Sequence, residues 1–448
     1  MENMNIFGTD GIRGRANNGY ITPDNIMKIA ISSVMYYSSL PREKPYCNGK
    51  FTVVIGKDTR LSGYMLESAL MAGFISSGAD VRLLGPIPTP AVSVITRSLR
   101  ADLGVVISAS HNPYEDNGIK FFNSRGFKIS PYDEMEISKI FHNNNFEFAS
   151  PDHMGKARRI DDADGRYVEF VKSSFPRDMT LSGMKIVIDT ANGASYKIAP
   201  EVFWELGAEI IHIGNDPDGL NINKGCGATD TKLLQKTVIE NNADIGFAFD
   251  GDADRLIVVD DRGDIVDGDY ILASIATDWK SRGKLINNKV VATTMSNMGL
   301  ERYLKNIGIE LIRSDVGDKY VLEKMIESGA RIGGEKSGHI IPIDYASTGD
   351  GMVSALQVIS FLMNNRIKSS KIRDLYKTVP QSFLNIKKNI DLNDKNVQDI
   401  IYKIRNDILK DTGRIVIRRS GTENLIRVMI ESDEKLLIEK SMELIEDL

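Results

Sequence analysis

Cysteine is scarce in this sequence: the 448 residues include two, Cys47 and Cys226. They lie far apart and do not form the closely spaced pair that is typical of a metal site. A framework of disulfide bonds is therefore not expected, and the low cysteine content fits a reducing compartment.

Positive charge and long apolar runs are also lacking. The formal net charge of −5 argues against a protein that coats nucleic acid or binds a membrane through basic residues. No run approaches the ~18 apolar residues that span a bilayer, and the first residues, MENMNIFGTDGIRG, contain no apolar signal segment. The sequence predicts a cytoplasmic protein without nucleic-acid or membrane partners. A small anionic substrate is still allowed, since it needs only local positive charge.

The length suits roughly two to four domains. Strand-like and helix-like segments alternate along most of the chain. Residues 51–56 (FTVVIG) read as a strand, residues 62–78 as a helix that Ser62 caps and Gly78 ends, and residues 80–85 as the next strand. This alternation predicts an α/β fold.

A similar pattern recurs three times along the chain. ADLGVVISASHNP begins at Ala101, ADIGFAFDGDADR at Ala243 and ARIGGEKSGH at Ala330. Each copy has an alanine, a polar residue, an aliphatic residue and a glycine before a polar cluster. Strands with polar turns precede the copies at 51–59, 184–193 and 288–297. Three related α/β domains are the simplest interpretation, although α/β domains share generic strand patterns in any case.

The last part of the chain has a different pattern. It reads as a strand (382–390), a helix (393–411), a strand (413–419), a turn (420–424), a strand (425–432) and a final helix (434–448). That order predicts a small α+β domain with an antiparallel hairpin. The predicted domains are 1–155, 156–258, 259–370 and 371–448, with a linker near 145–160.

The DGDADR motif places Asp250, Asp252 and Asp254 directly after an apolar strand. Three carboxylates this close repel one another unless a cation neutralises them, and oxygen ligands suit Mg²⁺ or Ca²⁺. An EF-hand is excluded because its sixth and twelfth positions are Arg255 and Asp261 here, not Gly and Glu. The alternative is an exposed acidic turn without a metal.

The SASHNP motif follows another apolar strand. Serine beside histidine suggests a hydrolase, but the Gly-x-Ser-x-Gly turn of a nucleophile elbow is missing. A serine that carries a phosphoryl group is the other interpretation. Ser108 lies nearer the strand and suits a capping role, which favours Ser110 as the reactive residue. Strand ends of this kind gather ligands in open α/β sheets.

Two further motifs offer polar groups on tight turns. GEKSGH (334–339) could hydrogen-bond sugar hydroxyls, and RRSGTENLIR (418–427) could bind phosphate through guanidinium groups, hydroxyls and backbone N–H groups. Each motif alone is equally consistent with an ordinary polar turn or hairpin.

Basic residues lie in or beside these loops, although the chain is acidic overall. The FGTDGIRG motif presents Arg13 between glycines and lacks the Walker pattern of a nucleotide-binding loop. The full set is Arg13, Lys120, Arg255, Lys319, Arg418 and Arg427. These cations predict an anionic ligand, with phosphate the best candidate. The hypothesis from the residues alone is phosphoryl transfer on a phosphosugar, with a metal ion and a serine.

With these motifs quoted, the chain resembles the α-D-phosphohexomutase superfamily over essentially its whole length. FGTDGIRG, ISASHNPYEDNGIKFF, FDGDADR, GEKSGH and RRSGTENLIRVM occur in the family's order. CGATD (226–230), SNMGLE (296–301) and SGTE (420–423) are similar to the bacterial phosphoglucosamine mutase branch. Asn424 departs from the proline that relatives usually carry there, and Lys336 occupies a variable position.

The resemblance implies three similar mixed α/β domains plus a smaller C-terminal α+β domain around a central cleft. In order, they would carry the phosphoserine loop, the metal loop, the sugar-binding loop and the phosphate-binding loop. It further implies these roles: Ser110, His111, Lys120, Arg13 and Arg255 in catalysis; Asp250, Asp252, Asp254 and the Ser110 phosphate on one Mg²⁺; Glu335, Ser337 and Lys319 on the sugar; and Arg418, Ser420, Gly421, Thr422 and Arg427 on the distal phosphate.

The implied reaction interconverts glucosamine 6-phosphate and glucosamine 1-phosphate and feeds the synthesis of UDP-N-acetylglucosamine. A 1,6-bisphosphate serves as intermediate and activator, and a phosphate donor or kinase must prime the serine once. A homodimer is expected from the family alone. His111 and Lys120 both remain candidates for the acid/base role. The alternatives are a phosphomannomutase/phosphoglucomutase and a non-catalytic sugar-phosphate sensor on the same scaffold.

Overall fold

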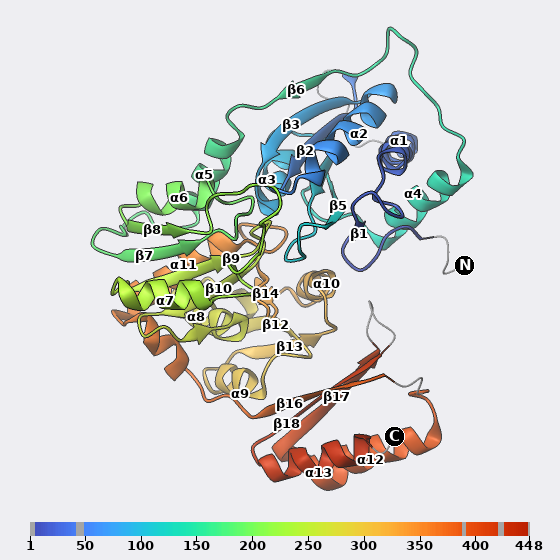
Figure 1. The fold of residues 1–448 in the computed structure, drawn as a ribbon. Coiled ribbons are helices and arrows are strands. Elements are labelled where there is room, and N and C mark those ends of the chain that lie inside the picture. The colour runs from blue at the N-terminus through green and yellow to red at the C-terminus, as the bar shows by residue number, and fades with distance from the viewer. Residues whose placement is uncertain (1–4, 42–48, 388–390, 420–424, 447–448) are drawn as a thin grey trace.

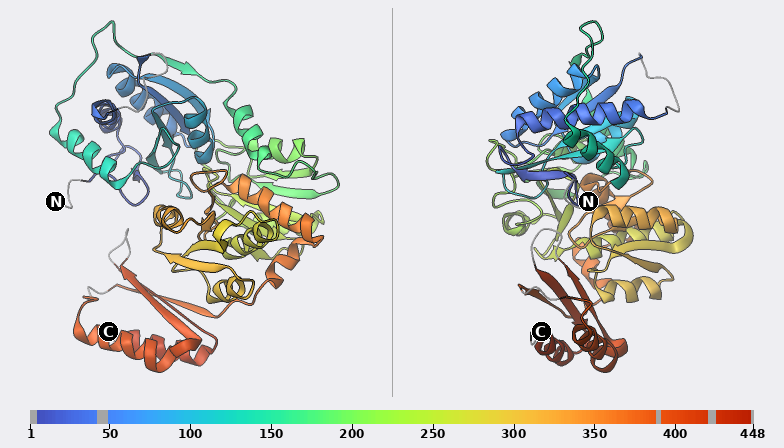
Figure 2. Two further views of the ribbon diagram at one scale, coloured as in Figure 1. Left: turned by 180° about the vertical axis from the view of Figure 1, so that it is seen from behind. Right: turned by 90° about the vertical axis from the view of Figure 1, so that its right-hand side faces the viewer.

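The structure is a computed structural model, which describes residues 5–41, 49–387, 391–419 and 425–446. It contains four sheets that follow one another along the chain. Figures 1 and 2 show the first sheet at one end of the molecule and the fourth at the other, with the second and third between them. Among the described helices, none is long and apolar enough to cross a membrane.

The first sheet has six strands in the order β1-β5-β4-β2-β3-β6. Its strands are β1 (Ile12–Arg15), β2 (Thr52–Lys57), β3 (Asp80–Pro86), β4 (Leu103–Ile107), β5 (Asp116–Asn123) and β6 (Ala157–Arg159), and its helices are α1 (Pro23–Ser39), α2 (Ser62–Ser76), α3 (Thr89–Ser98) and α4 (Pro131–Asn143).

The second and third sheets have the orders β11-β10-β9-β7-β8 and β13-β12-β14-β15. The second contains β7 (Lys185–Asp189), β8 (Glu209–Ile213), β9 (Ile245–Phe249), β10 (Leu256–Asp260) and β11 (Ile265–Val266), with helices α5 (Ala163–Ser173), α6 (Ile198–Glu205) and α7 (Lys232–Glu240). The third contains β12 (Lys289–Thr293), β13 (Glu310–Ser314), β14 (Ile332–Gly334) and β15 (Ile340–Pro342), with α8 (Gly268–Ser281), α9 (Met298–Asn306), α10 (Asp318–Ser328) and α11 (Gly351–Asn365).

The three sheets share one arrangement. The strands β4, β9 and β14 each lie between a parallel neighbour (β2, β7 or β12) and an antiparallel one (β5, β10 or β15). The next strand beyond the parallel neighbour is β3, β8 or β13. The internal repeat is therefore confirmed, and each of its three polar loops leaves a corresponding strand.

The fourth sheet is antiparallel, in the order β16-β18-β17. The elements are β16 (Gln381–Ile386), α12 (Lys395–Lys403), β17 (Gly413–Arg419), β18 (Ile426–Ser432) and α13 (Lys435–Glu446). This confirms the predicted α+β unit with its hairpin. The helix predicted for 393–411 continues beyond α12 as a π-helical segment, Ile404–Leu409, and the chain then turns at Lys410, where φ is 48°.

The predicted cap of α2 is wrong. The helix begins at Ser62 itself, and the capping position belongs to Leu61. The Ser62 hydroxyl instead accepts a hydrogen bond of 2.8 Å from Asn117 Nδ2 on β5. This long-range contact outweighs the local preference of serine for a cap. The helix ends at Ser76, and Gly78 follows with φ at 86°.

One large hydrophobic cluster joins the first three units. It contains Val92 of α3, Val202 of α6, Trp279 of α8 and Leu356 of α11, all fully buried. The sheets also extend slightly past two predicted boundaries, because β6 pairs with β3 and β10 continues to Asp260. The boundaries themselves stay predictions. The shared core fixes the strand ends of the three units relative to one another.

Candidate active site

The loop after β4 places Ser110 at the centre of the site. Ser110 is 1 % exposed, and its backbone φ is 53°. This left-handed value is uncommon for a residue other than glycine. The Ser110 hydroxyl donates a 2.7 Å hydrogen bond to Asp250 Oδ2 and lies 3.3 Å from His111 Nδ1. The Ser110 N–H donates to Ser108 Oγ at 2.9 Å. Ser108 therefore contacts the backbone of the loop, while Ser110 presents its hydroxyl to the aspartates.

Two residues that the sequence reasoning missed hold this loop from outside. Arg60 follows β2 and is buried; its guanidinium donates to the backbone carbonyl groups of Ser110 and Asn112. Asn223, from the second unit, donates to the same two carbonyl groups at 3.0 and 3.1 Å. These bonds oppose the cost of the left-handed backbone. Arg60 follows the polar turn after β2, and that turn was the available sequence signal for it. The sequence contained no comparable signal for Asn223.

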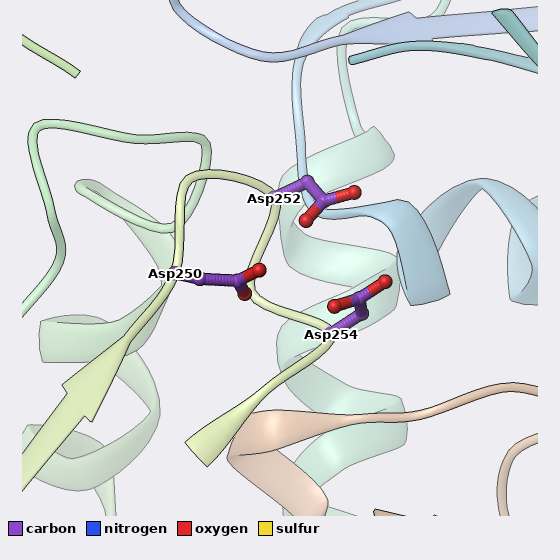
Figure 3. A group of neighbouring side chains, drawn as sticks. All are labelled: Asp250, Asp252 and Asp254. Atoms are coloured by element: carbon purple, nitrogen blue, oxygen red, sulfur yellow. The ribbon is translucent and has the colours of Figure 1, made fainter. Parts of the chain in front are cut away.

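Asp250, Asp252 and Asp254 lie on the loop between β9 and β10, and their carboxylates face a common space (Figure 3). One oxygen of each lies within 4.8 Å of the others, and all three residues are buried. Burial, and then the charges of Asp254 and Asp252, raise the pKa of Asp250 to about 8. Within the described part of the chain, Asp252 Oδ1 and Asp254 Oδ1 find no hydrogen-bond donor.

This donor set fits a hard divalent cation. Its candidate ligand atoms are carboxylate oxygens, and the triad contains two buried oxygens without a hydrogen-bond donor. A cation would relieve the mutual repulsion of the carboxylates. The loop also packs tightly against the serine loop: a Cβ atom added at Gly251 would lie 2.7 Å from the Ser110 carbonyl oxygen. The residues can therefore hold a metal ion beside the Ser110 hydroxyl.

Lys120 lies on β5, opposite Val106 of β4. Its ammonium group lies 3.1 Å from Asp252 Oδ2, 3.5 Å from Asp254 Oδ2 and 3.2 Å from Asp10 Oδ2. Burial alone would lower the pKa of Lys120, but these three carboxylates outweigh burial and raise it. Lys120 is therefore held as a cation in this arrangement.

Arg13, His111 and Arg255 lie around the same point. Burial, followed by the charges of Arg255 and Arg13, lowers the pKa of His111 to about 4. The Arg255 Nε lies 3.9 Å from Asp250 Oδ2, and its side chain is 22 % exposed. Arg13 forms an ion pair with Asp10. The structure thus brings the five predicted catalytic residues together. The His111 imidazole is held in its neutral form, and three cations are able to face an anion.

Asp10 is a third residue that the sequence reasoning missed. Its carboxylate forms ion pairs with Arg13, Lys120 and Lys128. Burial would raise the pKa of Asp10, but the three cations together lower it well below its usual range. The signal was its position in FGTDGIRG, three residues before Arg13, where a carboxylate and a guanidinium can meet.

The GEKSGH loop reaches the metal loop through His339. The His339 Nδ1 lies 3.5 Å from Asp254 Oδ1, and its Nε2 lies 3.6 Å from Asp318 Oδ2. Glu335 accepts a 3.1 Å hydrogen bond from the backbone N–H of Gly317, which joins this loop to the start of α10, where Lys319 lies. The Lys319 ammonium lies 5.2 Å from the centre of the Tyr320 ring. Ser337 is exposed.

The fourth unit contributes Arg418 of β17 and Arg427 of β18, which are directly opposed in the hairpin. Burial, and then the charge of Arg427, lower the pKa of Arg418, while the nearby carboxylate of Glu335 opposes the shift. Arg418 is therefore near the GEKSGH loop. The other predicted phosphate-binding residues, Ser420, Gly421 and Thr422, lie outside the described residues.

Four family models match nearly the whole chain. They are described as the phosphoglucomutase/phosphomannomutase alpha/beta/alpha domains I (residues 4–148), II (165–263) and III (267–382) and the C-terminal domain (376–448). The chain belongs to the phosphoglucomutase/phosphomannomutase family. This confirms the resemblance to phosphohexomutases and the predicted fold class.

Similar curated proteins name a particular enzyme within this family. The chain is 51 % identical to phosphoglucosamine mutase of Parvibaculum lavamentivorans over 437 residues, covering 96 % of this chain and 95 % of that protein. It is also 51 % identical to phosphoglucosamine mutase of Zymomonas mobilis, covering 96 % of both chains. A phosphoglucomutase/phosphomannomutase family protein of Burkholderia thailandensis has a similar structure, with a TM-score of 0.82 at 24 % identity, covering 99 % of this chain and 96 % of that one. The last likeness concerns the fold alone.

Proposed function

We propose that this enzyme interconverts glucosamine 6-phosphate and glucosamine 1-phosphate. Identity of about half the residues with phosphoglucosamine mutases over nearly the full length supports this substrate. The observation that carries the chemistry is the Ser110 hydroxyl, which donates to Asp250 within a buried aspartate triad. A hydroxyl so placed suits a phosphoryl carrier whose charge a cation would balance.

In this mechanism Ser110 starts as phosphoserine. The sugar 1-hydroxyl attacks phosphorus, the bond from phosphorus to Ser110 Oγ breaks, and a bond from phosphorus to O1 forms. The proton of the 1-hydroxyl passes to a base. His111 and Lys120 are the two acid/base candidates, and because Lys120 is held as a cation here, it could accept this proton only after giving up its own. The resulting 1,6-bisphosphate turns over, and Ser110 Oγ attacks its 6-phosphate. The bond from phosphorus to O6 breaks, the proton held by the base passes to O6, and glucosamine 1-phosphate leaves.

The cations around Ser110 would stabilise the transferring group. Arg13, Lys120 and Arg255 are positioned by ion pairs with the aspartates of the site, so little reorganisation is needed when charge develops on the phosphoryl oxygens. Asp250, Asp252, Asp254 and the Ser110 phosphate would hold a Mg²⁺ ion, which supplies charge neutralisation at those oxygens.

The remaining residues would bind the substrate away from the reacting phosphorus. Glu335, Ser337 and Lys319 are proposed to bind the sugar, and Arg418, Arg427 and residues 420–422 the other phosphate. Because the sugar turns over during the reaction, this distal site must accept either phosphate. A phosphate donor or kinase would prime Ser110 once, and 1,6-bisphosphate would reactivate enzyme that has lost its phosphoryl group.

The substrate is tested by comparing mutase activity on glucosamine, glucose and mannose 6-phosphates side by side. We expect the largest kcat/KM with glucosamine 6-phosphate. A larger value with glucose or mannose would assign the chain to a phosphoglucomutase or phosphomannomutase activity instead, and no turnover of any of the three would support a sensor. The intact mass of the purified chain, before and after incubation with bisphosphate, should show one added phosphate that maps to Ser110.

A further inference from the structure

A partly buried ion-pair contact joins the first and third units beside the site. The ammonium group of Lys128 forms ion pairs with Asp10 of the first unit and with Asp318, the first residue of α10. The side chains of Lys128 and Asp318 are 18 % and 14 % exposed. One lysine therefore connects the carboxylate that holds Arg13 and Lys120 to the third unit.

This contact closes a ring of polar contacts between acidic and basic side chains. From Asp318 the ring continues to His339, at 3.6 Å, and from His339 to Asp254, at 3.5 Å. It returns through Lys120, which lies 3.5 Å from Asp254 and 3.2 Å from Asp10. The ring passes through three units in the order Asp10, Lys128, Asp318, His339, Asp254 and Lys120. A shift of α10 away from the first unit would break it at Lys128.

A second hydrogen-bonded contact lies close to this ion pair. The Ser347 hydroxyl donates to the Gly126 carbonyl at 2.6 Å and lies 2.8 Å from the hydroxyl of Ser93. A cavity of about 220 Å³ lies beside Lys128 and Asp318, with Ile129 and Leu322 in its wall. Apolar packing is incomplete there, so polar contacts join the turn 126–128 to the third unit at this point.

We propose that the contact between Lys128 and Asp318 keeps the 1,6-bisphosphate on the enzyme while it turns over. This inference rests on the proposed function, because only a mutase must hold a bisphosphate between two transfers. Asp318 lies next to Lys319 and one residue after Gly317, whose N–H donates to Glu335. Loss of this contact would let the start of α10 shift together with Gly317 and Lys319, while the shared core keeps the three units in place. The bisphosphate would then leave before its second phosphate is returned. Lys128 and Asp318 are positioning residues in this account and do not contact the reacting atoms.

The test follows the fate of the intermediate. Enzyme carrying a labelled phosphoryl group on Ser110 is mixed with glucosamine 6-phosphate, and the label is measured as free bisphosphate and as monophosphate. We expect Asp318→Asn to raise the fraction released as bisphosphate up to about fivefold, the range of a partly exposed ion pair, with the rate of the first transfer nearly unchanged. Lys128→Met should release more bisphosphate than wild type. Lys128→Arg, which keeps the positive charge, should retain the bisphosphate as wild type does. Lys324→Met, which removes an exposed lysine of the same helix that pairs with Glu327, is the matched control.

The outcomes separate the two proposals. A wild-type chain without mutase activity contradicts the proposed function, whatever the variants do. An active wild type with equal bisphosphate release from Asp318→Asn contradicts the role of the contact. If Lys128→Met does not fold, Asp318→Asn carries the test, because its side chain keeps the same shape. A merely structural role would lower the thermal stability of Asp318→Asn without changing this partition of the label.

Discussion

The Ser110 hydroxyl donates a 2.7 Å hydrogen bond to Asp250 Oδ2 across 140 positions of sequence. The two residues follow β4 and β9, which occupy the same place in the first and second sheets. The ends of these two equivalent strands therefore lie close together. One is followed by the Ser110 hydroxyl and the other by the three carboxylates. This relationship makes Ser110, and not Ser108, the residue that a bound cation would reach.

Replacing Ser110 with alanine should remove mutase activity. The variant retains the metal loop and the surrounding cations, but the reaction has no acceptor for the phosphoryl group. We expect kcat to fall by at least about a thousandfold, as for other enzymes that lose their nucleophile, and the chain to show no added phosphate by intact mass. Retained activity in Ser110→Ala would contradict the mechanism.

Ser108→Ala is the matched comparison, since it changes the neighbouring serine of the same loop. It removes the acceptor of the Ser110 N–H, and an unsatisfied buried donor costs about 1–3 kcal/mol. We expect a lower free energy of unfolding, measured by denaturant titration, with phosphorylation of Ser110 retained. If Ser108→Ala lost the phosphate and Ser110→Ala kept it, the assignment of the two serines would be reversed.

Asn223→Ala should slow phosphoryl transfer, because Asn223 donates to the carbonyl groups of Ser110 and Asn112 from the second unit. Losing both bonds lets the left-handed backbone at Ser110 relax, and we expect kcat to fall about tenfold, which corresponds to ~1.4 kcal/mol. Single-turnover transfer from phosphoserine measures this effect. Asn241→Ala, at the end of α7, is the control, and an equal rate in both variants would contradict the role of Asn223.

The sequence predicted the fold, and it indicated the serine loop and the aspartate triad, because those features have local signals. Strands β4, β9 and β14 are short, buried runs that end in polar clusters. Asp250, Asp252 and Asp254 occupy alternate positions after β9, and three carboxylates this close indicate a cation that neutralises them. The repeat then places these clusters at equivalent strand ends. The local pattern favoured Ser110 over Ser108 and indicated a metal at Asp250, while the resemblance to phosphohexomutases supplied the roles of the other site residues.

Arg60 and Asn223 could not be assigned in the same way. Arg60 acts through backbone carbonyl groups 50 and 52 positions away, and a carbonyl group has no sequence signature. Asn223 reaches Ser110 from another unit. The error at Ser62 has the same cause, since its hydroxyl accepts from Asn117 of β5 and not from its own helix. The roles of these residues depend on tertiary contacts, which a single sequence does not reveal. The motifs could be predicted because they depend on local sequence preferences.

Magnesium should stabilise the folded chain through the aspartate triad. A ligand that binds only the folded state adds about 2.7 kcal/mol when its free concentration is about 100 times its Kd. We expect Mg²⁺ to raise the melting temperature of chelator-treated wild type and to have a much smaller effect on Asp252→Asn. Asp161→Asn, whose side chain is 91 % exposed, should respond like wild type. Equal stabilisation of Asp252→Asn would place the metal elsewhere.

Glu134 should make stability fall as pH rises toward neutrality. Burial raises the pKa of Glu134 from 4.5 to about 7, against the charges of Lys319 and Lys128. Between these pH values the folded chain binds more protons than the unfolded chain at this group, so its contribution to stability decreases with rising pH. Partial exposure limits the effect to about 1–2 kcal/mol.

Glu134→Gln should remove this loss. Denaturant titrations at pH 5 and pH 8 should show a smaller fall in the free energy of unfolding for Glu134→Gln than for wild type. Glu136→Gln alters the same helix at a residue that pairs with Lys139, and it should keep the wild-type dependence. If the free energy of unfolding of Glu134→Gln fell between pH 5 and pH 8 as much as that of wild type, another group would be responsible for the pH dependence.

Arg418→Met tests the predicted distal phosphate site. Arg418 and Arg427 are opposed across the β17–β18 hairpin, so two like charges face the position where a bound phosphate would neutralise them. Hydrogen bonds between a cation and an anion contribute about 1.5–3 kcal/mol, and we therefore expect kcat/KM to fall by about ten- to a hundredfold. Inorganic phosphate should also stabilise Arg418→Met less than wild type against heat. Arg405→Met replaces an exposed arginine of the same unit and controls for the loss of surface charge. An equal loss of kcat/KM in Arg405→Met would contradict a phosphate site at this hairpin. An unchanged kcat/KM in Arg418→Met would contradict it as well.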